Sequence, residues 1–144
     1  RKLATSRSIT MTLILLTLTL FTQPLPQAAP TPPPVSGSAE IAAFVEALNS
    51  CTAAKAATPH PLMRTFTVEH TVAGITATGC DYRQTMPGRM AMVCSLSPAG
   101  RKALATEISV YAKGGSISGS TSAAKPVWWS ECQLELPDGK RQPM

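Results

Sequence analysis

The fold is decided by residues 66–94, which read FTVEHTVAGITATGCDYRQTMPGRMAMVC. In the first part, apolar residues and His70 alternate with threonine and glutamate, which is the period of two that a strand with one covered face requires. A second run covers residues 75–84, and a third begins near Arg89 and continues to Leu96. The stretch therefore predicts three consecutive antiparallel strands.

Two turn signals separate these strands. Gly74 offers the first turn. The second is formed by Met86, Pro87, Gly88 and Arg89, where proline fixes φ at the second position and glycine tolerates the positive φ of a type II turn at the third. The strands are thus predicted to follow one another as a meander.

The alternation also sorts the side chains onto two faces. Cys80 and Tyr82 share one face, while their neighbours Asp81 and Arg83 point to the other. One face of the third strand carries Met90, Met92, Cys94 and Leu96. Cys80 and Cys94 are therefore expected to face the same core. A three-residue loop between their strands would place them opposite each other, and a two-residue loop would offset them by one.

A helix is predicted before the strands. Ser38 is a suitable cap, and the residues after it place one apolar face at Ile41, Phe44, Val45, Leu48 and Cys51. The helix is expected to end near Ala56 or Ala57, because Pro59 cannot continue it. Cys51 then faces the same core as the other cysteines.

A second helix is predicted after the third strand. Ser97 would cap it, Pro98 suits its first position, and Leu104, Ile108 and Tyr111 form its apolar stripe. Residues 127–136 alternate again and are expected to form a fourth strand. The predicted fold is α+β, with the N-terminal helix packed on a three- to four-stranded antiparallel meander.

Cys51, Cys80, Cys94 and Cys132 contain no C-x-x-C pair, which argues against a thioredoxin-like or zinc-ribbon site. In a small exported domain four cysteines usually form two disulfides. Three pairings are possible, and the sequence does not choose between them. We prefer Cys51 with Cys80, which ties helix to sheet, and Cys94 with Cys132, which ties down the C-terminal segment.

Export is indicated by residues 1–28, which have the pattern of a signal peptide. Basic residues precede an apolar and threonine run from Ile9 to Phe21, and this run is shorter than the ~20 residues of a spanning helix. Cleavage is expected near Ala28 or Ala29, the alternative being an uncleaved anchor as the only link to a membrane. The remaining expected parts are a proline-rich linker (29–38), the disulfide-stapled domain (39–136) with a flexible Gly/Ser loop (114–126), and a disordered tail (137–144).

The charge points to no polyanionic partner. The formal net charge is +5, but removing Arg1, Lys2 and Arg7 leaves 10 basic against 8 acidic residues. This bias is too small and too dispersed for nucleic acid or an anionic membrane surface. A periplasmic or secreted location is expected.

The search for chemistry finds no catalytic motif and no indication of a cofactor. Ser122 and Lys125 match the S-x-x-K spacing of penicillin-binding enzymes, but they lie in the Gly/Ser loop. His70 beside a free cysteine would suit a small hydrolase or thiol enzyme. His70 with Met90 and Met92 would suit a soft metal such as copper. We favour core roles for His70 and the two methionines over either kind of chemistry.

Trp128 and Trp129 are the candidate partner-binding residues. If their segment is a strand, one of them points away from the core and can stack on a glycan or seat a protein. In its layout the chain resembles small exported proteins of Gram-negative bacteria with a signal peptide, a proline-rich spacer and a cysteine-containing α+β core, which implies a periplasmic address. We expect a non-enzymatic binding or accessory module, with copper handling or a small hydrolase or thiol enzyme as alternatives.

Overall fold

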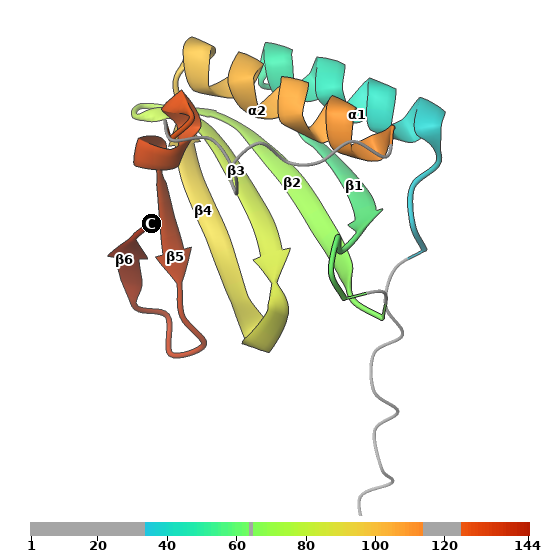
Figure 1. Cartoon of the computed structure of the whole chain (residues 1–144). Coiled ribbons are helices and arrows are strands. Elements are labelled where there is room, and N and C mark those ends of the chain that lie inside the picture. The colour runs from blue at the N-terminus through green and yellow to red at the C-terminus, as the bar shows by residue number, and fades with distance from the viewer. Residues whose placement is uncertain (1–33, 64, 114–124) are drawn as a thin grey trace, which may run out of the picture. The chain divides into compact units, whose positions relative to one another are not determined.

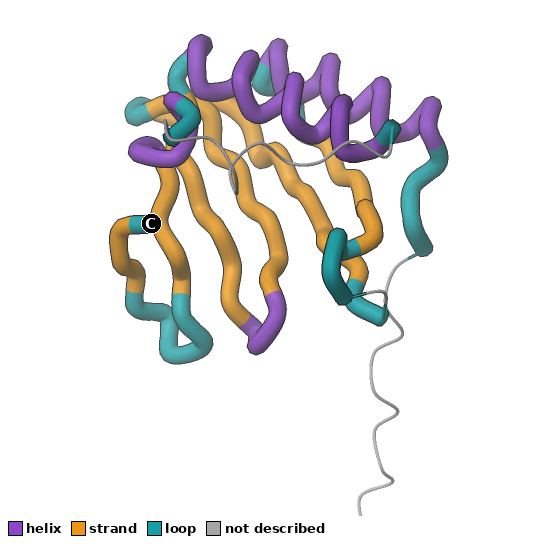
Figure 2. The backbone as a smooth tube through the Cα atoms, in the orientation of Figure 1, coloured by secondary structure: helices purple, strands orange, loops and turns teal. Residues whose placement is uncertain are grey.

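The computed structural model describes residues 34–63, 65–113 and 125–144. It shows a six-stranded antiparallel sheet in the order β1-β2-β3-β4-β5-β6, with two helices lying side by side, in opposite directions, across one face (Figures 1 and 2). The helices and strands are α1 (Ser38–Ser50), β1 (Ala54–Pro59), β2 (Thr67–Thr76), β3 (Gly79–Met86), β4 (Met90–Leu96), α2 (Pro98–Ala112), β5 (Cys132–Glu135) and β6 (Arg141–Pro143). Neither described helix is long and apolar enough to cross a membrane.

The α+β class is confirmed, but the sheet is larger than predicted and α2 follows the fourth strand instead of the third. Two strands are not predicted, β1 and β6, and the sequence pattern assigns the first residues of β1 to the end of the first helix. Cys51 adopts a left-handed conformation (φ 55°), and α1 therefore ends at Ser50. The alanines that follow form an edge strand, where Pro59 is tolerated because it closes the strand.

The three central strands were predicted correctly except for their first turn. Gly74 lies inside β2, where the register shifts between Val72 and Gly74, and its φ of 123° marks a bulge. The turn itself is made by Ala77 and Thr78, between Thr76 and its partner Gly79. A glycine next to a strand pattern can mark either a turn or a bulge, and the sequence does not distinguish between the two.

The second turn forms at the predicted residues, with glycine at a positive φ as predicted. Pro87, Gly88 and Arg89 form a single 3-10 turn, with Gly88 at φ 75°. The register is shifted from both predicted alternatives, because Met86 pairs with Met90 and Cys80 therefore lies opposite Leu96. Cys94 lies opposite Tyr82 instead. Both cysteines nevertheless face the core, as predicted.

The core lies between the helices and the covered face of the sheet. From α1 it takes Ile41, Phe44, Leu48 and Cys51, as predicted. From α2 it takes Leu104, Ala105 and Ile108, and from the sheet it takes Val72, Cys80, Tyr82, Met92, Cys94 and Leu96. Leu48 and Leu96 are almost completely buried, which places the densest packing where both helices cross the strands.

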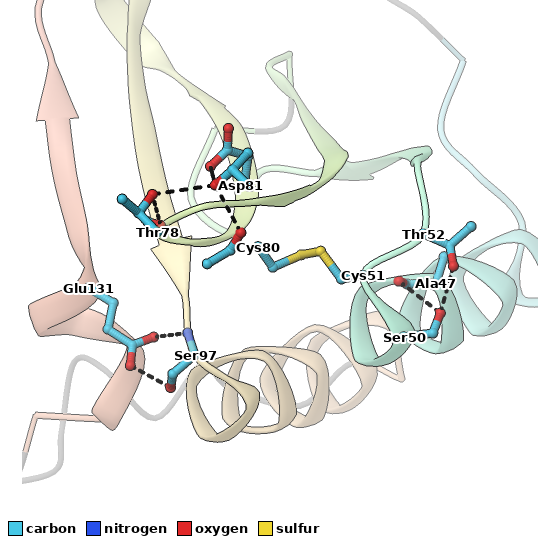
Figure 3. The surroundings of a disulfide bond; sticks show 12 residues. Ala47, Ser50, Cys51, Thr52, Thr78, Cys80, Asp81, Ser97 and Glu131 are labelled. Carbon is cyan, nitrogen blue, oxygen red and sulfur yellow. Dashed lines mark hydrogen bonds between the residues drawn. A yellow bond between two sulfur atoms is a disulfide. The ribbon is translucent and has the colours of Figure 1, made fainter.

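The structure contains two disulfides, and their pairing is the one preferred from the sequence. Cys51–Cys80 joins the end of α1 to β3 (Figure 3), and Cys94–Cys132 joins directly opposite residues of β4 and β5. No described cysteine is free. The bridges are consistent with an oxidising, extracellular environment.

The segment before β5 is a 3-10 helix, η3 (Val127–Glu131), rather than the start of a strand. Its Glu131 accepts hydrogen bonds from the Ser97 backbone N–H (3.0 Å) and hydroxyl (2.6 Å) at the start of α2 (Figure 3). Ser97 in turn caps α2 by accepting from the Gly100 N–H, as predicted for the cap. Negative charge at a helix N-terminus is favourable, and the contact fixes η3 against α2.

The C-terminal tail is ordered, which corrects the prediction of disorder over residues 137–144. Leu136 and Lys140 close a turn with Gly139 at φ 81°, and β6 then pairs with β5. Arg141 forms an ion pair with Glu135 (3.0 Å). The residues Pro137, Asp138 and Gly139 are a recognised turn signature that was overlooked.

Several predictions fall outside the described residues. The signal peptide, the first half of the linker and all but two residues of the expected Gly/Ser loop belong to them. The described end of the linker is attached to β1. The Ser36 backbone N–H donates to the Ala57 carbonyl, and the Ser36 hydroxyl accepts from the Ala57 N–H. Gly37, rather than Ser38, is the cap of α1.

The contact between η3 and α2 makes Gly100 an informative position. Replacing a helical glycine by alanine usually stabilises by about 1 kcal/mol. A Cβ at Gly100, however, would overlap the Glu131 carboxylate and push it away from Ser97. Gly100→Ala is therefore expected to lower the free energy of unfolding by about 1 kcal/mol, because two charge-assisted hydrogen bonds are lost.

Urea denaturation of a double-mutant cycle measures this effect. In a Glu131→Ala background the obstacle is gone, and the same Gly100→Ala change is expected to stabilise. An equal effect of Gly100→Ala in both backgrounds would show that Glu131 does not occupy that space.

Candidate functional site

A cavity of about 260 Å³ lies between α2 and the covered face of the sheet. In Figure 1 the helices cross the sheet toward the end that carries the β2–β3 turn, and they leave the end with the β3–β4 turn uncovered. Most of the cavity wall is apolar, with Val68, Met86, Met92, Leu104, Ile108 and Trp128 among its residues. Such a wall, with a few placed polar groups, is the usual make-up of a small-molecule site.

Three polar residues of the cavity wall, Thr58, His70 and Gln84, are joined through the buried Tyr82 in one directed chain of hydrogen bonds across β1, β2 and β3. The Tyr82 hydroxyl donates to Oε1 of Gln84 (3.0 Å), so its oxygen accepts from Nδ1–H of His70 (2.7 Å). Nε2 of His70 is then unprotonated and accepts from the Thr58 hydroxyl (2.9 Å). Each of these four side chains is held in place by the next.

Burial keeps this chain uncharged. His70 is 5% exposed, and desolvation lowers the pKa of its imidazole from 6.5 to about 4. Desolvation likewise raises the pKa of the Tyr82 phenol far above its ordinary value. At neutral pH the covered face therefore presents a neutral histidine, a neutral phenol and an amide.

The unpaired polar groups of the cavity wall are hydrogen-bond donors. Oε1 of Gln84 is taken by Tyr82, which leaves the side-chain NH₂. The indole N–H groups of Trp128 and Trp129 are buried and have no acceptor among the described residues. Nδ1 of His60 accepts from the backbone N–H groups of Leu62 and Met63, so the neutral ring carries its proton on Nε2.

The two tryptophans lie in this wall instead of on an open surface. Trp128 is 5% exposed and belongs to the core, and Trp129 is partly buried beside it with 5.6 Å between the ring centroids. Lys125 Nζ lies 5.2 Å from the centre of the Trp129 ring. Neither tryptophan is therefore the outward platform for a glycan or protein that a strand over residues 127–136 would have made.

The residues considered for metal or thiol chemistry are placed differently. Both ring nitrogens of His70 are hydrogen-bonded, so a metal would have to displace Thr58 or Tyr82. Met92 lines the cavity with His70, whereas Met90 is not among the lining residues. Within the described ranges no three His, Cys, Asp or Glu side chains gather as a metal site, and the cysteines are bridged.

The other face of the sheet carries a broader hollow of about 780 Å³ with a polar lining. Two of its lining residues, Arg83 and Arg141, form ion pairs with Glu135, at 2.7 and 3.0 Å. These hydrogen bonds lower the pKa of the Glu135 carboxyl. Ser95 donates to Thr78, and Thr76 donates to the Gly79 carbonyl. Several polar side chains of this hollow are therefore engaged with protein partners.

Sequence reasoning found Trp128, Trp129, His70 and Met92 but assigned them to separate sites. It missed Gln84 and Thr58, and it treated Tyr82 only as a core residue. The available signal was the shared face of alternate residues, because His70, Tyr82 and Gln84 point the same way in neighbouring strands. The register that brings His70 opposite Gln84 depends on the bulge at Gly74.

Comparison of the chain with protein-family models, with curated proteins and with solved structures finds no significant match.

Proposed function

We propose that this protein is an exported, non-enzymatic binding module whose ligand site is the cavity between α2 and the sheet. The observation that carries the proposal is the combination of an apolar cavity of about 260 Å³ with donors that lack a partner. A buried donor left unpaired costs about 1–3 kcal/mol, so a fold tolerates it where something else supplies the acceptor.

The scaffold around the cavity suits binding more than catalysis. The polar side-chain atoms of Thr58, His70 and Tyr82 are engaged in the hydrogen-bond chain. None of these three residues therefore offers a free general base or nucleophile to the cavity. These hydrogen bonds fix side chains of the cavity wall, which lowers the entropic cost of ordering them when a ligand binds. The signal-peptide pattern and the two disulfides support a periplasmic or secreted location.

Benzene is a suitable first probe, because apolar protein cavities of ~150 Å³ take it up. Both tryptophans of the chain line the cavity, so their emission reports on it without labelling. We expect saturable binding of benzene to the oxidised protein, seen as a change in tryptophan emission. At ten times Kd it should also stabilise the fold by about 1.4 kcal/mol in thermal unfolding.

A matched pair of variants on α2 locates the binding. Ile108→Phe fills the cavity from its wall and is expected to abolish the benzene response. Val110→Phe makes the same kind of enlargement at a 45% exposed position and should leave the response intact. A wild-type protein that does not bind benzene, or two variants that respond alike, would contradict a binding role for this cavity.

A further inference from the structure

The cavity wall has an excess of donors over acceptors. The two indole N–H groups have no acceptor among the described residues, and the Gln84 NH₂ and the His60 Nε2–H are further donors of the wall. Fewer side chains of the wall can accept: the Thr58 and Tyr111 hydroxyls, which donate their own protons to His70 and to the Pro59 carbonyl, and the carboxylate of Glu107, which is engaged in an interaction of its own. An occupant therefore meets groups that offer protons.

The charged residues of the cavity wall narrow the class of ligand further. No lysine or arginine is found among the described residues that line the cavity, and its wall contains Glu107. An anionic head would be buried without a cation and near a carboxylate, which is costly. An ammonium head would face donors, and Glu107 already has a partner. Both kinds of charged head are disfavoured.

We propose that the ligand of this cavity is an uncharged, largely apolar molecule whose polar end accepts hydrogen bonds and does not donate them, such as a ketone or an ester. Gln84 is the residue assigned to recognise the acceptor. The proposal rests on the proposed function and adds the chemical class of the ligand. A volume of about 260 Å³ suits a molecule of roughly ten non-hydrogen atoms.

Gln84 is suited to this role because hydrogen bonds with neighbouring side chains fix its position. Tyr82 holds its Oε1, and His70 and Thr58 hold Tyr82. An amide held at its oxygen cannot exchange its oxygen and nitrogen positions without breaking that bond, so the free end stays NH₂. A fixed donor in an apolar wall selects ligands that have an acceptor, because an occupant without one leaves the donor unpaired.

The test compares three probes of similar size in competition with benzene: hexyl methyl ketone, heptanoate and octylammonium. We expect the ketone to bind at least tenfold more tightly than either charged probe. The critical variant is Gln84→Glu, because one carboxylate oxygen still accepts from Tyr82 while the other replaces the donor by an acceptor. We expect it to weaken ketone binding at least fivefold more than it weakens benzene binding.

Gln84→Met provides a second measurement if Gln84→Glu perturbs the fold, and it should show the same excess loss of ketone affinity over benzene affinity. Benzene binding with heptanoate or octylammonium preferred to the ketone would overturn the inferred ligand class and leave the binding role standing. An equal loss of benzene and ketone affinity in both variants would overturn the role of Gln84. Failure of every probe, benzene included, would count against the proposed function itself.

Discussion

Removal of the Cys51–Cys80 bridge by the double change Cys51→Ala and Cys80→Ala is expected to lower the free energy of unfolding by about 4 kcal/mol. The bridge closes a chain segment with a sequence separation of 29, and the loop-entropy relation gives about that value at 25 °C. A domain of this size has ~5–15 kcal/mol in total. Urea denaturation of the oxidised proteins, followed by circular dichroism, measures the loss.

The second bridge supplies the comparison. Cys94–Cys132 spans a separation of 38, so the entropic contribution is similar, but it joins strands that are already paired by hydrogen bonds. Cys51–Cys80 is the covalent tie between α1 and the sheet. We expect Cys51→Ala with Cys80→Ala to expose the face of α1 near Leu48 to hydrogen exchange more than the other double variant does. A loss below 1 kcal/mol would show that packing alone holds α1.

The second large effect is acid destabilisation through His70. Its folded-state pKa of about 4 lies below the ordinary 6.5, so at intermediate pH the unfolded chain binds a proton that the folded protein does not. The stability is thus full above pH 6.5 and is lost as the pH falls towards 4. The slope approaches about 1.4 kcal/mol per pH unit, which makes a total loss of about 3 kcal/mol.

The matched variant for this prediction is His70→Gln, which removes the titrating group. Its stability curve from pH 7 to 4, measured by urea denaturation, should be flatter than that of the wild type by the same ~3 kcal/mol. Carboxyl groups such as Glu135 and Asp138 have lowered pKa values in both proteins, so their contributions cancel in the difference. Parallel curves for the two proteins would mean that His70 is not the source of acid sensitivity.

The sequence predicted most of the central sheet because its signals there are local. Alternation placed Cys80 and Tyr82 on the covered face, and Pro87 with Gly88 marked the second turn. The Ser97-Pro98 pair likewise located the start of α2. These features depend on a few neighbouring residues, so they can be read without knowledge of the tertiary structure.

Most errors come from features that tertiary contacts decide, whereas the turn at residues 137–139 before β6 has a local signature in the sequence. Residues 54–59 are rich in alanine, which favours helices, yet they form a strand because pairing with β2 and packing under the helices outweigh that propensity. The candidate site needed the strand register, since Thr58, His70 and Gln84 are far apart in sequence. The donor excess followed only from the direction of each hydrogen bond, which no sequence pattern contains.

The order of the disulfides along the chain has a consequence for biogenesis. The first cysteine is joined to the second and the third to the fourth, so the two covalent loops do not interleave. Coupling of the thiols in chain order, the first with the second and the third with the fourth, therefore gives the native pairing without an exchange of bridges.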